Sequence, residues 1–490
     1  MMRKILFLTA GLLISLINLQ AQTWTQVGQD IEGEAQGDYS GRSVSVNSDG
    51  TIVAVGAAAN DGVNGENSGH VRIYENQNEI WVQIGQDIDG EGINDLSSIA
   101  LSLNSDGTIV AIGAYNNDAN GEDSGHTRIY ENLNGTWTQI GEDIDGDAAG
   151  YGAGTSVSLS SDGTLVAIGT PFSTNDALLD GHVNVYENQN GTWVQIGQKI
   201  IGENEGDRFG ASVSLSADGS IVAIGTPHTD INGTSSGQAR MYENLNGTWT
   251  QIGQNLNGEA QSDNFGYSIS LSSNGSIVAI GAHKHSGKGH VKIFENTGGT
   301  WTQIGEDIDG KNANDWFGYS ISLSSNGLVV AIGALFNDGN GADAGHVRTY
   351  ENQDGTWVQK GQDLEGDAAD NRLGVSVSIN DDGSILATGA THNDGSYTDA
   401  GHVKVFSSST VDIKELSAHE INIYPNPSNG EFNINVQEMY NLQILDLAGR
   451  VIKTQILDKN KNTVKINESG IYYLKLTNEN TSLSQNIIVK

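Results

Sequence analysis

Seven tryptophans recur through most of the chain at a nearly fixed interval. They are Trp24, Trp81, Trp137, Trp193, Trp249, Trp301 and Trp357, spaced 57, 56, 56, 56, 52 and 56 residues apart. A Gly-His-Val triplet, or a close variant of it, repeats with the same period. A unit of this length cannot bury a core alone, so its repetition predicts an array in which neighbouring units supply each other's core.

The sequence of each unit predicts four β-strands. In the third unit a Ser-Asp-Gly turn at 161–163 follows the first strand, and Asn190-Gly191 separates the third from the fourth, as in tight hairpins. The array begins with a lone fourth strand at Trp24 and ends with a lone third strand at 403–406. Because these two pieces complete one unit, we expect an all-β, seven-bladed β-propeller over residues 22–408 with no open edge.

The charge of the chain excludes one class of partner and points to one face. The formal net charge is −36, from 60 acidic and 24 basic residues, which is incompatible with a nucleic-acid partner that needs clustered bases. In an antiparallel meander the long loops share one end, and most acids of the array lie in those loops. We therefore expect an acidic binding face there. The chain has no cysteine, which excludes disulfides and thiolate chemistry.

Both ends of the chain differ from the repeats. Residues 1–21 combine a basic start, an apolar run and a cleavage site near Ala21, as in a secretory signal peptide. No later stretch has the roughly 18 apolar residues of a membrane span, so none is expected after signal removal. A polar linker is predicted over 409–418. Residues 419–490 alternate short strands with turn residues, which predicts a small, immunoglobulin-like β-sandwich.

The last segment carries motifs of a known family. They are Tyr424-Pro425-Asn426-Pro427 with Gly430, then Gly449, then Gly470 within Gly-Ile-Tyr-Tyr-Leu-Lys. This pattern resembles the C-terminal sorting domain of type IX secretion substrates in Bacteroidota. The resemblance implies the type IX secretion machinery as a partner and export across the outer membrane. It also implies removal of the domain, with the product released or held at the cell surface.

The repeats also resemble a family. Phe209-Gly210, Phe265-Gly266 and Phe317-Gly318 precede the first strand of their units, as in FG-GAP repeats of integrin α subunits and bacterial surface proteins. The resemblance supports the propeller fold. The family's calcium loop, Asp-x-Asp-x-Asp-Gly, is replaced here by a short Ser-Asp-Gly or Ser-Asn-Gly turn, which puts that metal site in doubt.

Other acidic segments are candidate calcium ligands, because alternate residues of a strand share one side and calcium prefers oxygen ligands. The candidates are Asp87, Asp89, Glu91, Asp143, Asp145, Asp147, Asp118 and Asn120. The alternative is that these residues are solvated turn residues. His283, His285 and His290, in the shortened unit, are a candidate transition-metal site. We expect no other cofactor.

The repeats predict function only in outline. The units are closely alike, none carries a distinctive catalytic cluster, and both ends carry export signals. We therefore expect a secreted or surface binding or adhesion protein without catalytic residues, with an extracellular protein or glycan as ligand. The alternative is a secreted polysaccharide hydrolase or lyase with its site at the mouth of the propeller channel. A structural surface-layer component is a third interpretation.

Overall fold

The computed structural model describes residues 22–172, 181–410, 422–436, 439–445, 450–477 and 482–490. The predicted signal peptide and most of the predicted linker lie outside these residues. One compact unit spans Gln22–Ser409, and a second contains the C-terminal residues. Within the described residues no helix is long and apolar enough to cross a membrane.

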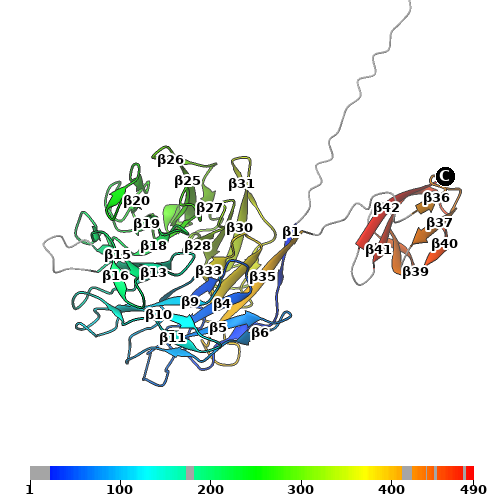
Figure 1. The fold of residues 1–490 in the computed structure, drawn as a ribbon. Helices are drawn as coiled ribbons and strands as arrows, with labels where there is room; N and C mark the ends of the chain where they lie inside the picture. Colours follow the sequence, from blue (N-terminus) through cyan, green and yellow to red (C-terminus); the bar gives the residue numbers. More distant parts are fainter. Residues whose placement is uncertain (1–21, 173–180, 411–421, 437–438, 446–449, 478–481) are drawn as a thin grey trace, which may run out of the picture. The chain divides into compact units, whose positions relative to one another are not determined.

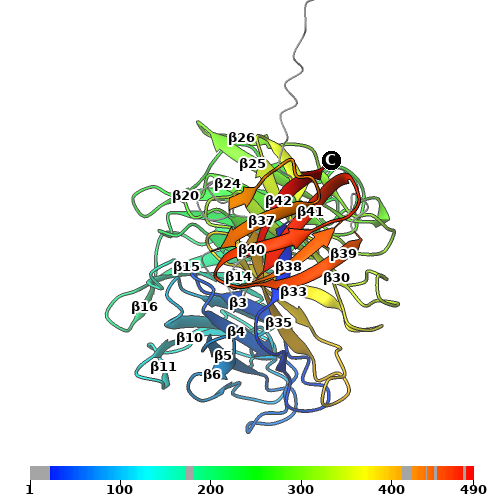
Figure 2. The same cartoon turned by 90° about the vertical axis from the view of Figure 1, so that its right-hand side faces the viewer.

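The first unit is the predicted seven-bladed propeller (Figure 1, Figure 2). Each blade is an antiparallel sheet of four strands, consecutive in the chain in six of the seven blades, with a two-residue fifth strand on the third. Blades one to seven are numbered by their innermost strands, which line the central channel. These are β3 (Ser43–Val46), β8 (Ala100–Leu103), β13 (Ser156–Leu159), β18 (Ser212–Leu215), β23 (Ser268–Leu271), β28 (Ser320–Leu323) and β33 (Leu373–Ile379).

The remaining strands follow the same order. The second strands are β4 (Ile52–Ala57), β9 (Ile109–Ala114), β14 (Leu165–Thr170), β19 (Ile221–Thr226), β24 (Ile277–Ala282), β29 (Val329–Ala334) and β34 (Ile385–Ala390). The third strands are β5 (His70–Asn76), β10 (His126–Asn132), β15 (His182–Asn188), β20 (Gln238–Asn244), β25 (His290–Thr297), β30 (His346–Gln353) and β35 (His402–Thr410).

The outer edge of each blade carries two shorter strands. The fourth strands are β6 (Trp81–Gln83), β11 (Trp137–Gln139), β16 (Trp193–Gln195), β21 (Trp249–Gln251), β26 (Thr300–Gln303), β31 (Thr356–Gln359) and β1 (Gln22–Gln26). The fifth strands are β7 (Ile88–Asp89), β12 (Ile144–Asp145), β17 (Ile200–Ile201), β22 (Leu256–Asn257), β27 (Ile308–Asp309), β32 (Leu364–Glu365) and β2 (Ile31–Glu32). A short 3-10 helix, η1 (His285–Gly287), lies in a loop of blade five.

The N-terminal strand completes the last blade, as predicted. The strand order of blade seven is β1-β35-β34-β33, so the two ends of the array pair with each other. Val27 donates its amide hydrogen to the carbonyl of Val405 at 2.8 Å, just beyond β1. Strand β35 extends to Thr410, two residues into the predicted linker. The pairing closes the ring, so that no blade lacks its fourth strand, and only the short outer strands remain as edges.

Two rings of hydrogen bonds run around the channel. In each innermost strand the serine before the last residue accepts a backbone amide hydrogen from the next blade. The ring runs from Ser45, which accepts from Leu103 at 3.0 Å, around to Ser378, which accepts from Val46 at 3.0 Å. At one end of the channel the turns between first and second strands also join in a circle. The amides of Ser48, Ser105, Ser161, Ala217, Ser273, Ser325 and Asp381 each donate to the next carbonyl at 2.7–3.1 Å, and Asp381 returns to Ser48.

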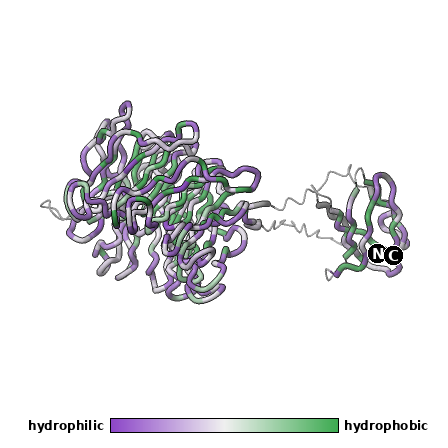
Figure 3. Tube along the Cα trace, turned by 90° about the horizontal axis from the view of Figure 1, so that it is seen from below, coloured by the Kyte–Doolittle hydropathy of each residue, from purple (hydrophilic) through white to green (hydrophobic). Residues whose placement is uncertain are grey.

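A third ring is made by the repeated tryptophans. Each indole nitrogen donates to a backbone carbonyl of the preceding blade, for example Trp81 to Val27 at 2.8 Å and Trp24 to Lys360 at 3.1 Å. In five blades a glutamine also bonds both backbone groups of the tryptophan, as Gln254 does with Trp301. The large side chains pack between blades, so the cores lie at the blade interfaces. In Figure 3 the hydrophobic stretches lie mainly in the interior of the propeller, and its periphery is mostly hydrophilic.

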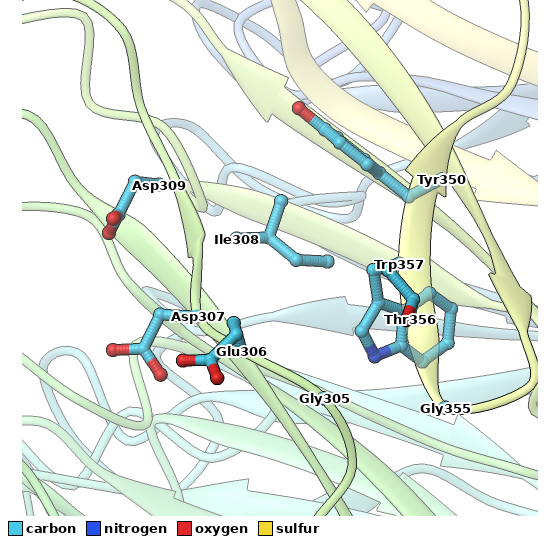
Figure 4. Close-up of a pocket in the computed structure, with 9 residues that line it drawn as sticks. All are labelled: Gly305, Glu306, Asp307, Ile308, Asp309, Tyr350, Gly355, Thr356 and Trp357. Carbon is cyan, nitrogen blue, oxygen red and sulfur yellow. The ribbon is translucent and has the colours of Figure 1, made fainter.

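We call each interface between neighbouring blades a seam. At two seams a glutamate replaces this glutamine: Glu142 at the seam of Trp193, and Glu306 at the seam of Trp357. Both tryptophans are half-buried, whereas the other five are at most 4% exposed. At the second seam a cavity of about 300 Å³ opens between Glu306 and Trp357. Figure 4 shows the Glu306 carboxylate pointing away from the indole. A carboxylate has no hydrogen to donate to the tryptophan carbonyl, so it cannot reproduce the paired contact.

The C-terminal unit is the predicted small β-sandwich. One sheet has the order β36-β37-β40 and the other β39-β38-β41-β42. Their buried faces form one core around Phe432, Ile444 and Leu474. The strands are β36 (Asn422–Tyr424), β37 (Glu431–Val436), β38 (Tyr440–Leu445), β39 (Val451–Leu457), β40 (Asn460–Lys465), β41 (Gly470–Thr477) and β42 (Ser482–Val489).

The sorting-signal residues have structural roles in this sandwich. Asn426 accepts the amide hydrogen of Ile488 at 3.0 Å, and Ser428, just after Pro427, pairs with the last strand. Gly430 has a φ of 97°, which favours glycine, and Gly470 begins β41. Tyr424 is exposed on β36 beside Lys461. Gly449 lies outside the described residues.

We expect Glu306→Gln to stabilise the propeller by about 1–2 kcal/mol, since it restores two hydrogen bonds worth about 0.5–1.5 kcal/mol each. The reverse change at an intact seam, Gln254→Glu, should destabilise it by a similar amount. Urea unfolding followed by tryptophan fluorescence measures both free energies of unfolding. Equal stability of Glu306→Gln and the unchanged protein would contradict this account of the seam.

Candidate functional site

The two ends of the channel are built differently. At the end with the short turns, the circle of backbone hydrogen bonds surrounds a polar cavity of only about 170 Å³. At the other end the long loops surround a cavity of about 620 Å³, continuous in its lining residues with the upper channel of about 460 Å³. Only the second end therefore offers room for a ligand.

We call this second opening the channel mouth. Its functional side chains come from blades one, six and seven, and none of the described residues lining it is acidic. They are Tyr39, Arg42, Trp316, Tyr319, Phe336, Arg372 and His392. The upper channel adds Phe172, Arg208, His228 and Tyr267. The mouth is therefore aromatic and basic in a chain whose net charge is −36.

One position in each blade has a left-handed backbone, and in five blades its side chain lines the mouth or the upper channel. It lies four residues before the first serine of the innermost strand, or before Ala100 in blade two. All seven residues have φ between 52° and 63°, and only two are glycine or asparagine. They are Tyr39, Leu96, Gly152, Arg208, Asn264, Trp316 and Arg372. Large residues rarely adopt this conformation, which is characteristic of residues held in place at functional sites.

Neighbouring loops hold this strained backbone. The amide of Tyr39 donates to the carbonyl of Asp399 at 3.2 Å, and that of Arg372 to Asp343 at 3.1 Å. Each acceptor belongs to the loop between the second and third strands of the preceding blade. The strain is thus offset by contacts between blades, and the side chains are fixed relative to the channel.

Aromatic rings form a continuous band across one side of the mouth. Phe336 lies 4.7 Å from Trp316, ring centre to ring centre, and His283 lies 5.0 Å from Trp316. His283 in turn lies 4.3 Å from Tyr267, which is 5.0 Å from Tyr319. These rings come from blades five and six. On the other side of the mouth, Tyr39 lies 4.8 Å from His392.

Four basic side chains surround the band: Arg42, Arg208, Lys284 and Arg372. Three of them lie over aromatic rings: Arg208 over Phe172 at 5.3 Å, Lys284 over Trp316 at 5.2 Å and Arg372 over Phe336 at 5.4 Å.

These four bases are not neutralised within the described part of the chain, where none forms an ion pair with a carboxylate. The basic residues of the third strands, by contrast, all pair with acids. They are Arg72, Arg128, Arg240, Lys292, Arg348 and Lys404.

Two titratable rings of the band, those of His283 and Tyr267, are uncharged at neutral pH. Burial, together with Lys284 and His228, lowers the pKa of His283 to about 3. Burial and the neighbouring Tyr319 raise the pKa of Tyr267 far above its ordinary value. The positive charge at the mouth is therefore that of its arginines and of Lys284 over Trp316, and not of these two rings.

The candidate calcium ligands lie in the outer part of the same face, and they are divided among several groups. Asp87 meets His70 and Glu34, and Asp143 meets His126 and Glu91, with ligand atoms within 4.8 Å in each group. Asp89 and Asp145 belong to neither group.

Cations of the chain already contact both groups. Arg72 bonds Asp87 at 2.8 Å and also contacts Glu34, while Arg128 lies 3.4 Å from Glu91. Asp147 pairs with Lys199 at 2.7 Å.

Asp118 and Asn120, the candidate calcium ligands in a loop, form hydrogen bonds with nearby backbone groups. Asp118 accepts the amide hydrogen of Asp123 at 2.9 Å, and Asn120 donates to the carbonyl of Gly146 at 2.9 Å. Calcium at any of these residues stays a prediction, and calorimetry at millimolar calcium tests it. Of the three histidines proposed for a transition metal, His285 stacks on His290 at 3.9 Å, while His283 lies in the aromatic band.

Sequence reasoning missed the channel mouth. It compared whole units, which are closely alike, and counted charge by loop without regard to distance from the axis. The available signal was the variation one residue before the Phe-Gly position, where the seven blades carry Tyr39, Leu96, Gly152, Arg208, Asn264, Trp316 and Arg372.

Comparison with protein families identifies both parts of the chain. The family described as a secretion system C-terminal sorting domain matches residues 422–490, and the FG-GAP repeat matches residues 202–242 and 309–350. Both predicted resemblances are confirmed. The sorting domain marks the chain for secretion and the cell surface. Comparison with curated proteins gives no match.

Several solved structures are similar to this chain at low sequence identity. PorZ, a surface component of the type-IX secretion system of Porphyromonas gingivalis, is 14% identical, with 93% of this chain and 60% of that chain covered and a TM-score of 0.47. The periplasmic gluconolactonase of Pseudomonas aeruginosa is 13% identical, covering 83% and 97%, with a TM-score of 0.47. The C-terminal WD40 domain of Sif2 is 11% identical, covering 79% and 99%, again at 0.47. Such similarity carries no information on activity.

The repeated histidines should make the propeller sensitive to acid. Burial, with His285, lowers the pKa of His290 from 6.5 to about 4, and burial with Arg348 lowers that of His346 to about 3. Between pH 6.5 and 4 the unfolded chain therefore binds protons that the folded chain does not. Stability is complete above pH 6.5 and falls as the pH falls, by about 1.4 kcal/mol per pH unit for each histidine.

The double variant His290→Gln and His346→Gln should lose less stability between pH 7 and pH 5, by about 2 kcal/mol per histidine replaced. Glutamine is the natural residue at this position in blade four, as Gln238, so the change suits the fold. Urea unfolding at the two pH values gives the comparison. An equal loss in both proteins would contradict the assignment.

Proposed function

Starting from an FG-GAP β-propeller that carries a type IX secretion sorting domain, we propose that this protein is a surface or secreted binding protein without catalytic activity. Its ligand docks at the channel mouth. One observation carries the proposal: the blades, alike elsewhere, differ from one another at the mouth, where strained residues present aromatic and basic side chains.

The other end of the propeller supports this choice of face. Its backbone circle leaves a small cavity whose lining is the same serine-rich turn in nearly every blade. A site that distinguishes one ligand needs a few polar groups placed asymmetrically around an apolar surface. The channel mouth has that character and the circle of turns does not.

The chemistry of the mouth favours binding over hydrolysis. Glycoside hydrolysis ordinarily uses two carboxylates, and no carboxylate is among the described residues that line the mouth. The raised pKa of Tyr267 keeps its phenol protonated, which disfavours a role as a base at neutral pH. A lyase or hydrolase remains the outcome to be tested against.

Trp316→Gly should weaken binding of the ligand at least tenfold while leaving the fold intact. Glycine is the natural residue at this position in blade three, as Gly152, and it adopts a φ of 56° without strain. The change removes the ring, so any loss of binding does not come from the backbone. Glycan arrays and immobilised extracellular polymers, probed with the full exported chain, give the ligand and its affinity.

Tyr397→Ala is the matched control. Tyr397 is an aromatic residue 52% exposed on a long loop of the same face, and it does not line the mouth. We expect its affinity to be unchanged. Equal binding by Trp316→Gly and the unchanged protein would exclude the mouth as the site. Product released in step with time and protein concentration would overturn the non-catalytic proposal.

A further inference from the structure

The distribution of charge on the binding face is the starting point. The acidic residues of the long loops lie in the outer part of the face, and many of them pair with the basic residues of the third strands. Arg42 and Arg372 instead line the mouth, Arg208 lines the upper channel and Lys284 lies over the ring of Trp316, while no acid is among the described residues that line either cavity. In a strongly acidic protein, such a group of unpaired cations lacks an internal counterion and is complementary to an anion.

The cations are also held in place. Arg372 lies over the ring of Phe336, and its Nε is buried without a hydrogen-bond partner. Arg208 and Lys284 are similarly placed over Phe172 and Trp316. A guanidinium stacked on a ring keeps its N–H edges free, and those edges match a carboxylate or sulfate with two parallel hydrogen bonds. Little side-chain freedom is lost when an anion binds to such a group.

The aromatic band indicates which class of molecule carries the anionic group that binds at the mouth. Trp316, Tyr319 and Phe336 line the mouth beside Arg42 and Arg372, so apolar ring surfaces and cations share one cavity of about 620 Å³. The negative face of an aromatic ring attracts the C–H groups of a sugar ring. A cavity of this size accommodates a few sugar units. A simple inorganic anion would not use the rings.

We propose that the ligand is an acidic polysaccharide, recognised a few sugar units at a time at the channel mouth. Sugar rings pack on Trp316, Tyr319 and Phe336. Carboxylate or sulfate groups bind Arg42 and Arg372. This assignment rests on the proposed function, because it names the ligand class of the same site.

The acidic surroundings add selectivity. A polyanion of any kind is repelled by the outer part of the face, and it gains attraction only where its charges reach the mouth. The mouth therefore favours binding of a ligand that combines anionic groups with ring surfaces. A flexible acidic peptide supplies the charges but not the sugar rings, and this predicts weaker binding than for an acidic oligosaccharide of equal charge.

Isothermal titration of the full chain tests the proposal with four probes. These are oligogalacturonate, which is carboxylated, a sulfated dextran oligomer, a neutral dextran oligomer and a poly-glutamate peptide. We expect one or both acidic oligosaccharides to bind at least tenfold more tightly than the neutral oligomer and the peptide. The carboxylated and sulfated probes distinguish the two sources of the anion.

Arg42→Gln and Arg372→Gln should each weaken that binding about tenfold or more, since each removes a charge while keeping a polar side chain. Lys311→Gln is the control: Lys311 is an exposed cation in an outer loop, 3.6 Å from Asp363, and should leave affinity unchanged. Thermal unfolding of every variant verifies the fold.

The outcomes separate the ligand class from the proposed function. Binding of the neutral oligomer that depends on Trp316 but not on the arginines would overturn the acidic ligand and leave the proposed function standing. Equal, arginine-dependent binding of the peptide would overturn the glycan. Ultraviolet absorbance from an unsaturated product would keep the acidic glycan and overturn the non-catalytic function. No Trp316-dependent binding of any probe would overturn the acidic polysaccharide, while the wider glycan array would decide the site.

Discussion

The hydrogen bonds between blades are the constraint on which the rest of this propeller depends. The turns of the innermost strands form a closed circle from Ser48 to Asp381 and back. A circle of this kind exists only if all seven blades are present and the last meets the first. Strand β1 makes that meeting possible, because it supplies the outer strand of blade seven. Closure therefore links residues near both ends of the array, and the indole bond from Trp24 to Lys360 secures the same seam at the periphery.

Rigidity at one end of the channel permits variation at the other. The blades are joined through their backbones and through repeated serine and tryptophan contacts, and none of these serines or tryptophans lines the mouth. Trp316 and Arg372 can then occupy a left-handed backbone that large residues otherwise avoid. Contacts with the preceding blade hold that backbone, as in the bond from Arg372 to Asp343. The same closed scaffold that makes the blades alike thus allows the mouth to differ.

The period of the tryptophans predicted the number of blades, and the incomplete first and last units predicted the closure. Both follow from pattern alone, because a β-propeller repeats one unit with the same contacts. The repeat pattern does not predict which residues form the mouth, because it contains no information on their distance from the channel axis. Arg42 lies only four residues after Asp38, so a count of charge along the chain places them together. In the structure Arg42 lines the channel, whereas the buried Asp38 caps its own loop through the amide of Ala35.

The same reasoning explains why the acidic loops do not by themselves define a ligand site. Asp363 receives two hydrogen bonds from Arg348, at 2.8 and 2.7 Å, and this pairing lowers its pKa. Equivalent cations in other blades occupy Asp87 and Asp367. Breaking one of these pairs would leave a charged group with no partner, so these acids stabilise the fold through their ion pairs. The cations at the mouth form no such ion pairs within the described residues. The excess of acid around the propeller and the few bases at its centre are then two parts of one arrangement, in which structural acids surround a site that selects for anions.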